Sequence, residues 1–132
     1  MNDQELPRCV LIVEDEMCLA LTLEDILLDA GCRVLKAARL PAALALAESS
    51  EVIDAAILDI NLSGTLVFPA ADALQRRGIP LLFTSGYGES GLPPLYRKWP
   101  MLQKPYGIER LRQALTALLG DDVVSHARPT ER

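Results

Sequence analysis

Residues 9–15 have the sequence CVLIVED, a run of five apolar residues that ends in two acids. The run is short and contains β-branched side chains, which is typical of a strand buried on both faces. Strands of this kind occur almost only in parallel sheets that carry helices on both sides. The stretch therefore predicts an α/β fold whose first strand presents Glu14 and Asp15 at its carboxyl end.

The rest of the chain repeats this alternation of apolar strand and amphipathic helix. A stripe of apolar residues from Leu19 to Ala30 predicts a helix that Gly31 ends, and Pro41 opens an Ala-rich helix that ends at 49–50. The other predicted elements are strands at 33–37, 55–58, 80–83 and 101–103, a helix in the second half of 66–77 and an amphipathic helix over 108–119. Buried strands joined by crossover helices favour a five-stranded parallel sheet covered on both faces.

The segment 86–100 breaks the pattern, because it contains three glycines and three prolines. Such a composition is poor in helix formers, so we expect the fourth helix to be short or irregular. Four larger side chains of the segment fit the core and an exposed partner-binding patch equally well. They are Leu92, Leu95, Tyr96 and Trp99.

Length and charge limit the classes of function. The 132 residues suffice for one compact domain, and the net charge of −5 argues against a cationic face for nucleic acid or an anionic membrane. No apolar run is long enough to span a membrane, and the polar start MNDQE differs from a signal peptide. We expect a cytoplasmic protein with an N-terminal extension over 1–7, one domain over 8–119 and a flexible tail over 120–132.

The three cysteines do not suggest a metal site. Cys9, Cys18 and Cys32 lack a CxxC spacing, and the one histidine, His126, stands near the end of the chain. A structural zinc site needs four clustered ligands, which this set does not supply. We expect these thiols to be buried or half-buried and to have no role.

Polar side chains follow the predicted strands at one edge of the sheet, where parallel α/β sheets bind their ligands. They are Glu14 and Asp15 after the first strand, Asp59 after the third, Ser85 after the fourth and Lys104 after the fifth. Taken alone, Asp59 is a helix or turn cap about as often as a functional residue, and each of the others is more often a helix start, a turn hydroxyl or a solvated charge. Their convergence on one edge favours a functional site.

The chemistry of this set points to phosphoryl transfer. Three neighbouring carboxylates repel one another, and a hard divalent cation such as Mg²⁺ or Mn²⁺ relieves the repulsion. A carboxylate that attacks phosphorus, as Asp59 can, forms an acyl phosphate. Lys104 would neutralise charge on the transferring oxygens, and the Ser85 hydroxyl would donate to the phosphate formed.

The order of these residues resembles the receiver domain of bacterial two-component response regulators, over about residues 8–119. The resemblance implies a flavodoxin-like (βα)5 doubly wound sandwich. It implies that Asp59 is the phospho-acceptor and that the lysine of the Lys104–Pro105 pair binds the phosphate, turned inward by a cis bond before Pro105. It also implies that Glu14, Asp15, Asp59 and the backbone carbonyl of Asn61 hold the metal, and that Ser85 is the switch hydroxyl.

The run from Phe83 to Gly88, FTSGYG, resembles the FATGUY group of single-domain receivers. Counting five residues on from Pro80 favours Ser85 over Thr84 as the switch hydroxyl, and both stay candidates. Gly86 and Tyr87 are expected to modulate the site, Gly86 through close approach and Tyr87 as a shield or merely as packing.

Other positions depart from the common receiver pattern. Met101 stands where many receivers carry a switch aromatic. Ser63 replaces the usual proline after the phospho-acceptor, and Leu66 and Val67 replace a later Asp-Gly turn. We expect the loop from Asp59 into the following helix to differ from that of common receivers.

The resemblance implies a signalling protein that is not an enzyme in the ordinary sense. A sensor histidine kinase or histidine phosphotransfer protein would donate the phosphoryl group. Because no output domain is expected after residue 119, the output would be a protein contact through the face from the fourth strand to the fifth helix, or phosphate drainage. We expect no binding to nucleic acid or to membranes.

Two alternatives were weighed against this function. A haloacid-dehalogenase-type phosphatase carries an Asp-x-Asp motif after its first strand, whereas here position 61 is asparagine and the acid pair precedes Asp59. A binding module that kept the fold but lost phosphorylation would lack an acid, the hydroxyl or the lysine, and none is missing.

Overall fold

The computed structural model describes residues 7–86 and 92–119. Five parallel strands form one sheet in the order β2-β1-β3-β6-β7. The strands are β1 (Cys9–Val13), β2 (Arg33–Ala37), β3 (Ala55–Asp59), β6 (Leu81–Ser85) and β7 (Met101–Gln103). Since β1 and β3 are neighbours in this order, the acids at their carboxyl ends meet at one edge of the sheet.

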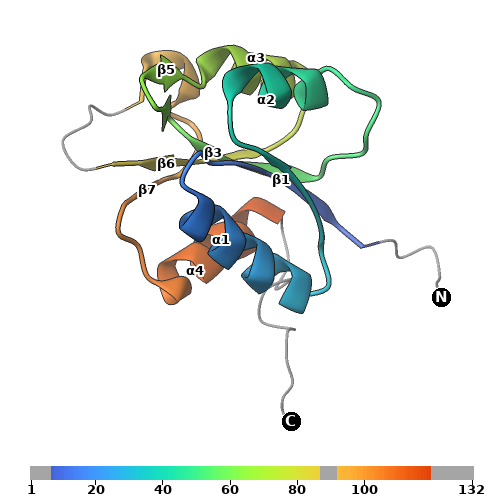
Figure 1. Cartoon of the computed structure of the whole chain (residues 1–132), viewed down its shortest axis with the longest axis vertical. Helices are drawn as coiled ribbons and strands as arrows, with labels where there is room; N and C mark the ends of the chain where they lie inside the picture. The colour runs from blue at the N-terminus through green and yellow to red at the C-terminus, as the bar shows by residue number, and fades with distance from the viewer. Residues whose placement is uncertain (1–6, 87–91, 120–132) are drawn as a thin grey trace, which may run out of the picture.

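Helices cover both faces of the sheet. In Figure 1, α2 and α3 lie on one side and α1 and α4 on the other. The helices are α1 (Met17–Asp29), α2 (Leu40–Ala47), α3 (Phe68–Arg76) and α4 (Ile108–Leu119). This is the expected doubly wound, flavodoxin-like sandwich. No helix among the described residues is long and apolar enough to cross a membrane.

Two apolar clusters hold the layers together, and the strands feed them alternately because successive side chains point to opposite faces. Leu58 and Phe83 pack in the cluster under α2 and α3, whereas Ile57 and Leu82 pack in the cluster under α1 and α4. Every residue of β1, β3 and β6 is buried. The continuous apolar runs of the sequence therefore correspond to strands covered on both faces.

Most predicted elements are confirmed, and several boundaries differ. The helix predicted in the second half of 66–77 begins at Phe68, and the strand predicted over 55–58 includes Asp59, which was expected directly after it. The strand predicted over 80–83 begins one residue later and continues through Ser85, because Ser85 pairs with Gln103 of β7. The helix predicted to end at 49–50 stops at Ala47. There the Ser49 hydroxyl donates to the Leu46 carbonyl and accepts from the Glu51 N–H, which replaces helical hydrogen bonds.

The loop after Asp59 forms a small antiparallel hairpin that the sequence did not predict. Its strands are β4 (Asn61–Leu62) and β5 (Thr65–Leu66). The two turn residues, Ser63 and Gly64, have φ values of 55° and 95°. Glycine adopts that region freely, whereas serine adopts it at a cost. The hairpin places Ser63 near the acid edge of the sheet.

The described part of the Gly/Pro-rich segment contains one 3-10 turn (Pro94–Tyr96), so the expectation of a short fourth helix is confirmed. Leu92 and Tyr96 belong to the core, where the Tyr96 ring stacks on Phe68 with 4.9 Å between centroids. Trp99 is half-buried and donates to Gln75, whereas Leu95 is 62% exposed. The segment thus contributes mainly to the core.

The cysteines are partly as expected. Cys9 and Cys32 are buried, but Cys18 is exposed, so the expectation of a buried or half-buried thiol is wrong at this position. The buried positions of α1 are Ala20, Leu23 and Leu27, and Cys18 lies off that stripe.

Candidate functional site

Three carboxylates meet at the carboxyl ends of β1 and β3. Carboxylate oxygens of Glu14, Asp15 and Asp59 all lie within 4.8 Å of one another. Glu14 and Asp59 are each 4% exposed, and Asp15 is half-buried. Charged oxygens at this spacing and depth repel strongly unless a cation lies among them.

Lys104 supplies one such cation. Its Nζ atom lies 3.0 Å from Glu14 Oε1 and 3.1 Å from Asp59 Oδ2. The Lys104 backbone N–H donates to the Ser85 carbonyl at 2.8 Å, which holds the chain against the end of β6. The Lys104–Pro105 bond is cis, as the resemblance implied. The ammonium therefore lies between two buried carboxylates from different strands.

The raised pKa of Glu14 shows that the Lys104 ammonium alone does not neutralise the negative charge of the three carboxylates. Burial raises the pKa of Glu14 to about 7, and the negative charge of Asp59 raises it as well, although the Glu16 N–H and Lys104 act against them. Burial lowers the pKa of Lys104, but its hydrogen bonds to Glu14 and Asp59 outweigh this and raise it. An all-oxygen set with excess negative charge fits a hard divalent cation such as Mg²⁺.

The hairpin after β3 connects two of the acids. The Asn61 N–H donates to Asp59 Oδ1 at 3.3 Å, and the Asn61 side-chain oxygen accepts from the Gly64 N–H at 2.6 Å. The Ser63 hydroxyl donates to the Asp15 carboxylate. The sequence reasoning assigned no role to Ser63, although its replacement of a proline was a signal that this loop is unusual.

Ser85 and Thr84 are both buried at the end of β6, with 2% and 1% exposure. Ser85 is the last residue of the strand rather than the first residue after it, which corrects the prediction. Thr84 pairs in register with Asp59, so the two side chains share one side of the sheet. Among the described residues, the Thr84 hydroxyl has no hydrogen-bond partner. Both hydroxyls stay candidates for the switch position.

The other predicted site residues lie around the same edge. Gly86 follows β6 directly and Pro105 follows Lys104. Tyr87 lies outside the described residues. Met101, in β7, is 37% exposed.

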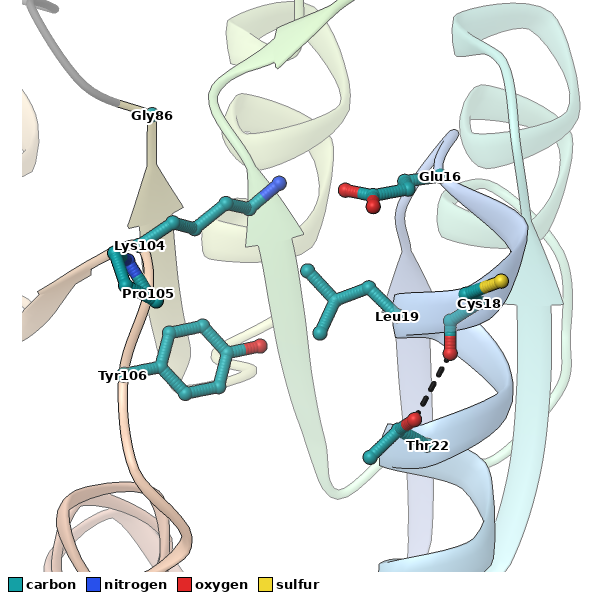
Figure 2. A pocket seen from close by; sticks show the side chains of 8 residues that line it. All are labelled: Glu16, Cys18, Leu19, Thr22, Gly86, Lys104, Pro105 and Tyr106. Carbon is teal, nitrogen blue, oxygen red and sulfur yellow. Dashed lines mark hydrogen bonds between the residues drawn. The ribbon is translucent and has the colours of Figure 1, made fainter.

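A cavity of about 620 Å³ opens beside Lys104, between α1 and the loop that follows β7 (Figure 2). Its lining residues are Glu16, Cys18, Leu19, Thr22, Gly86, Lys104, Pro105 and Tyr106. Tyr106 is a lining residue that the sequence pattern did not indicate, because the receiver motif at this strand end consists of the Lys-Pro pair. The position next to that pair was a signal, because Tyr106 follows the inward-turned lysine by only two residues.

Comparison with known proteins agrees with this geometry. No protein-family model and no curated protein matches the chain. Among solved structures, the single-domain receiver SdrG from Sphingomonas melonis Fr1 is 38% identical, with a TM-score of 0.76. The alignment covers 87% of this chain and 98% of SdrG. This chain belongs to the response regulator receiver domains of two-component signalling.

Two further receiver structures bear on the site. The beryllofluoride-activated conformation of SdrG, from Pseudomonas melonis Fr1, is 40% identical with a TM-score of 0.69, over 84% of this chain and 95% of that one. The receiver domain of a sensor histidine kinase from Pseudomonas aeruginosa PAO1 has magnesium coordinated in its active-site cleft. It is 22% identical with a TM-score of 0.71, over 87% of this chain and 99% of that one, which supports the shared fold.

Receiver domains are signalling proteins rather than classical enzymes, and they interact with histidine kinases or phosphotransfer proteins. Membership in this family argues against the haloacid-dehalogenase alternative, because the solved structures that match the chain are response regulator receiver domains.

Proposed function

We propose that this receiver accepts a phosphoryl group on Asp59 from a phosphohistidine, with Mg²⁺ or Mn²⁺ as the cofactor. The donor would be a sensor histidine kinase or a histidine phosphotransfer protein. The observation that carries the proposal is the Lys104 ammonium shared between Asp59 and Glu14, with Asp15 in the same cluster. A structural ion pair would not need the third acid.

The transfer requires an oxygen lone pair that can reach phosphorus, and it requires that the negative charge on the reacting oxygens be neutralised. An Asp59 oxygen attacks phosphorus while the bond from phosphorus to the imidazole nitrogen breaks. The electron pair of that bond stays on the ring nitrogen, and the ring leaves as neutral imidazole when its other nitrogen carries a proton. Lys104, already 3.1 Å from Asp59, is placed to hold a phosphoryl oxygen.

The residues present fit the divalent cation. Glu14, Asp15, Asp59 and the backbone carbonyl of Asn61 would hold it. When bound, the cation would neutralise negative charge on the carboxylates and on the phosphoryl oxygens.

Signalling would follow from the new phosphate oxygens. We propose that Ser85, or Thr84 in its place, donates to the phosphate, and that Gly86 and Tyr87 adjust the approach and lifetime of the group. The face formed by β6, β7 and α4 would then change its affinity for a downstream protein, or the domain would act as a phosphate sink. The domain assists its own phosphorylation and dephosphorylation.

The test is intact mass spectrometry after incubation with acetyl phosphate and Mg²⁺. We expect the gain of one phosphoryl group, lost in Asp59→Asn and in the presence of a chelator. Asp72→Asn is the matched control, because Asp72 is a partly exposed carboxylate on α3 that pairs with Arg76. Full phosphorylation of Asp59→Asn would overturn the proposal, as would a wild-type chain that neither gains the group nor binds beryllofluoride with Mg²⁺.

A further inference from the structure

Tyr106 is a residue of the site whose role is unassigned. It follows Pro105, lines the cavity beside Lys104 and packs on the apolar cluster under α1 and α4. Figure 2 shows its phenol oxygen directed toward Leu19 and α1, below the Lys104 ammonium. The aromatic ring would pack equally well without its hydroxyl group.

The hydroxyl group is what needs an explanation. It is buried, and it has no hydrogen-bond partner among the described residues. A buried hydroxyl without a partner is unfavourable, and phenylalanine in the same place would avoid that penalty. Buried polar groups that lack a partner often have one in another state of the protein.

The surroundings of the phenol indicate which group that partner is. Burial raises the pKa of Tyr106 to about 12, and the negative charge of Glu14 raises it further, with Lys104 acting in the opposite direction. Glu14 thus has the largest effect of the charged groups near the phenol, and the phenol stays protonated at neutral pH. Tyr106 lines the same cavity as Lys104, whose ammonium lies 3.0 Å from Glu14 Oε1, so the phenol is a permanent hydrogen-bond donor on the side of the site that holds the Glu14 carboxylate.

The donors that now hold Glu14 are of two kinds. The Glu16 N–H donates to Oε2 at 3.0 Å and will remain in place, because it is part of the backbone. The Lys104 ammonium lies 3.0 Å from Oε1 and 3.3 Å from Oε2, and it also contacts Asp59. When Asp59 carries a phosphoryl group, the same ammonium has new oxygens to bind, so Glu14 loses a donor.

We propose that Tyr106 is a positioning residue of the receiver site, whose phenol donates to Glu14 when Lys104 turns from Glu14 to the phosphoryl group. The inference rests on the proposed phosphorylation of Asp59. Without a phosphoryl group on Asp59 (the unloaded state), the Tyr106 hydroxyl does not stabilise the site. With the phosphoryl group (the loaded state), its hydrogen bond keeps Glu14 oriented as a metal ligand.

The test compares two ligands in Tyr106→Phe, by titration calorimetry. Magnesium alone leaves Lys104 on Glu14, so its dissociation constant should stay within about twofold of the wild-type value. Beryllofluoride with Mg²⁺ mimics the phosphoryl group and engages Lys104, so its affinity should fall by about tenfold, the effect of one hydrogen bond to a charged group. The rate of phosphorylation by acetyl phosphate should fall in parallel.

Tyr96→Phe is the matched control. Tyr96 is also a buried tyrosine, but it lies in the apolar cluster on the opposite face, where its hydroxyl is 3.4 Å from the Phe68 carbonyl. We expect Tyr96→Phe to leave both affinities unchanged. The melting temperature of unloaded Tyr106→Phe should equal or exceed that of the wild type, which separates this role from a structural one.

Three outcomes would overturn the inference. They are unchanged beryllofluoride affinity in Tyr106→Phe, an equal loss of affinity for Mg²⁺ alone, and a lowered melting temperature of the unloaded variant. The failure of the proposed function looks different, because the wild type itself would then bind no beryllofluoride, and the inference would fall with it.

Discussion

At the scale of single residues, Glu14 is a carboxylate whose ionised form is destabilised by burial and by the neighbouring Asp59. It is 4% exposed beside a second buried carboxylate, and its position at the end of β1 is set by a strand that is buried throughout. A surface glutamate would have water to solvate it, whereas Glu14 has one backbone N–H and a shared ammonium. The ionised form of Glu14 is therefore destabilised when no cation is bound, and a bound cation would stabilise it.

This predicts a pH dependence of stability in the metal-free protein. The pKa of Glu14 in the folded protein, about 7, lies above its ordinary value of 4.5, so the folded state binds the proton more tightly than the unfolded state. The free energy of unfolding should therefore fall as the pH rises from about 4.5 to about 7, by up to roughly 3 kcal/mol. Urea unfolding at several pH values with a chelator present measures this slope.

Glu14→Gln should remove the Glu14 part of that slope, since glutamine does not titrate. Glu48→Gln is the control, because Glu48 is an exposed carboxylate at the end of α2. A slope that persists unchanged in Glu14→Gln would mean that another group titrates in this range.

At the scale of elements, the ends of α2 and α3 are joined by an arginine. The Arg77 guanidinium donates to the Ala47 carbonyl at 2.9 Å and to the Glu51 carbonyl at 2.6 Å. Both carbonyls lie at or just after the end of α2, where helical carbonyls lack partners. The neighbouring Arg76 side chain is exposed and pairs with Asp72, so the two arginines at the end of α3 differ in their surroundings.

The neighbouring arginines give a matched pair of variants. Arg77→Ala should lower the free energy of unfolding by about 1–2 kcal/mol, because two carbonyls lose a charged donor. Arg76→Ala should cost less than about 0.5 kcal/mol, since its ion pair with Asp72 is exposed. Denaturant unfolding of both variants checks the prediction, and equal losses would show that the two carbonyl contacts contribute nothing.

The hairpin β4–β5 is the element that most distinguishes this chain from its expected pattern. In its first strand the Asn61 N–H donates to the Asp59 carboxylate, and in its turn the Ser63 hydroxyl donates to the Asp15 carboxylate. Because these hydrogen bonds hold two of the three acids, the conformation of the hairpin affects the geometry of the candidate metal site.

At the scale of the whole molecule, the doubly wound sheet concentrates charge at one edge while apolar clusters fill both of its faces. Three carboxylates contributed by β1 and β3 face a single ammonium that follows β7. A ligand that neutralises this edge binds the folded chain and not the unfolded one, so it stabilises the fold as a whole.

Magnesium should therefore raise the melting temperature. At a concentration of about 100 times its dissociation constant, the stabilisation is about 2.7 kcal/mol, which corresponds to a shift on the order of 10 °C for a domain of this size. Asp15→Asn should lose most of the shift, whereas Asp72→Asn should keep it. Scanning calorimetry with and without a chelator makes the measurement, and an undiminished shift in Asp15→Asn would exclude Asp15 as a ligand.

The sequence alone determined the fold class and the members of the acid edge. The run from Cys9 to Val13 has the composition of a strand buried on both faces, and strand order in such a fold brings the ends of β1 and β3 together. The identities of Glu14, Asp15, Asp59 and Lys104 could be predicted because each stands at or just after the end of a recognisable apolar strand, Asp59 as the last residue of β3. Local patterns are sufficient for features of this kind.

Only the tertiary structure decided which groups are partnered and which are buried. The extension of β6 through Ser85 depends on pairing with β7, and the contact of the hairpin turn with Asp15 joins residues 48 positions apart. The exposure of Cys18 depends on which face of α1 packs on the sheet. The unpartnered hydroxyl of Tyr106 and the sharing of Lys104 between two carboxylates are likewise invisible in the sequence. Burial and hydrogen bonding are properties of the three-dimensional neighbourhood, and residues 14, 59, 104 and 106 become neighbours only when the sheet and its helices assemble.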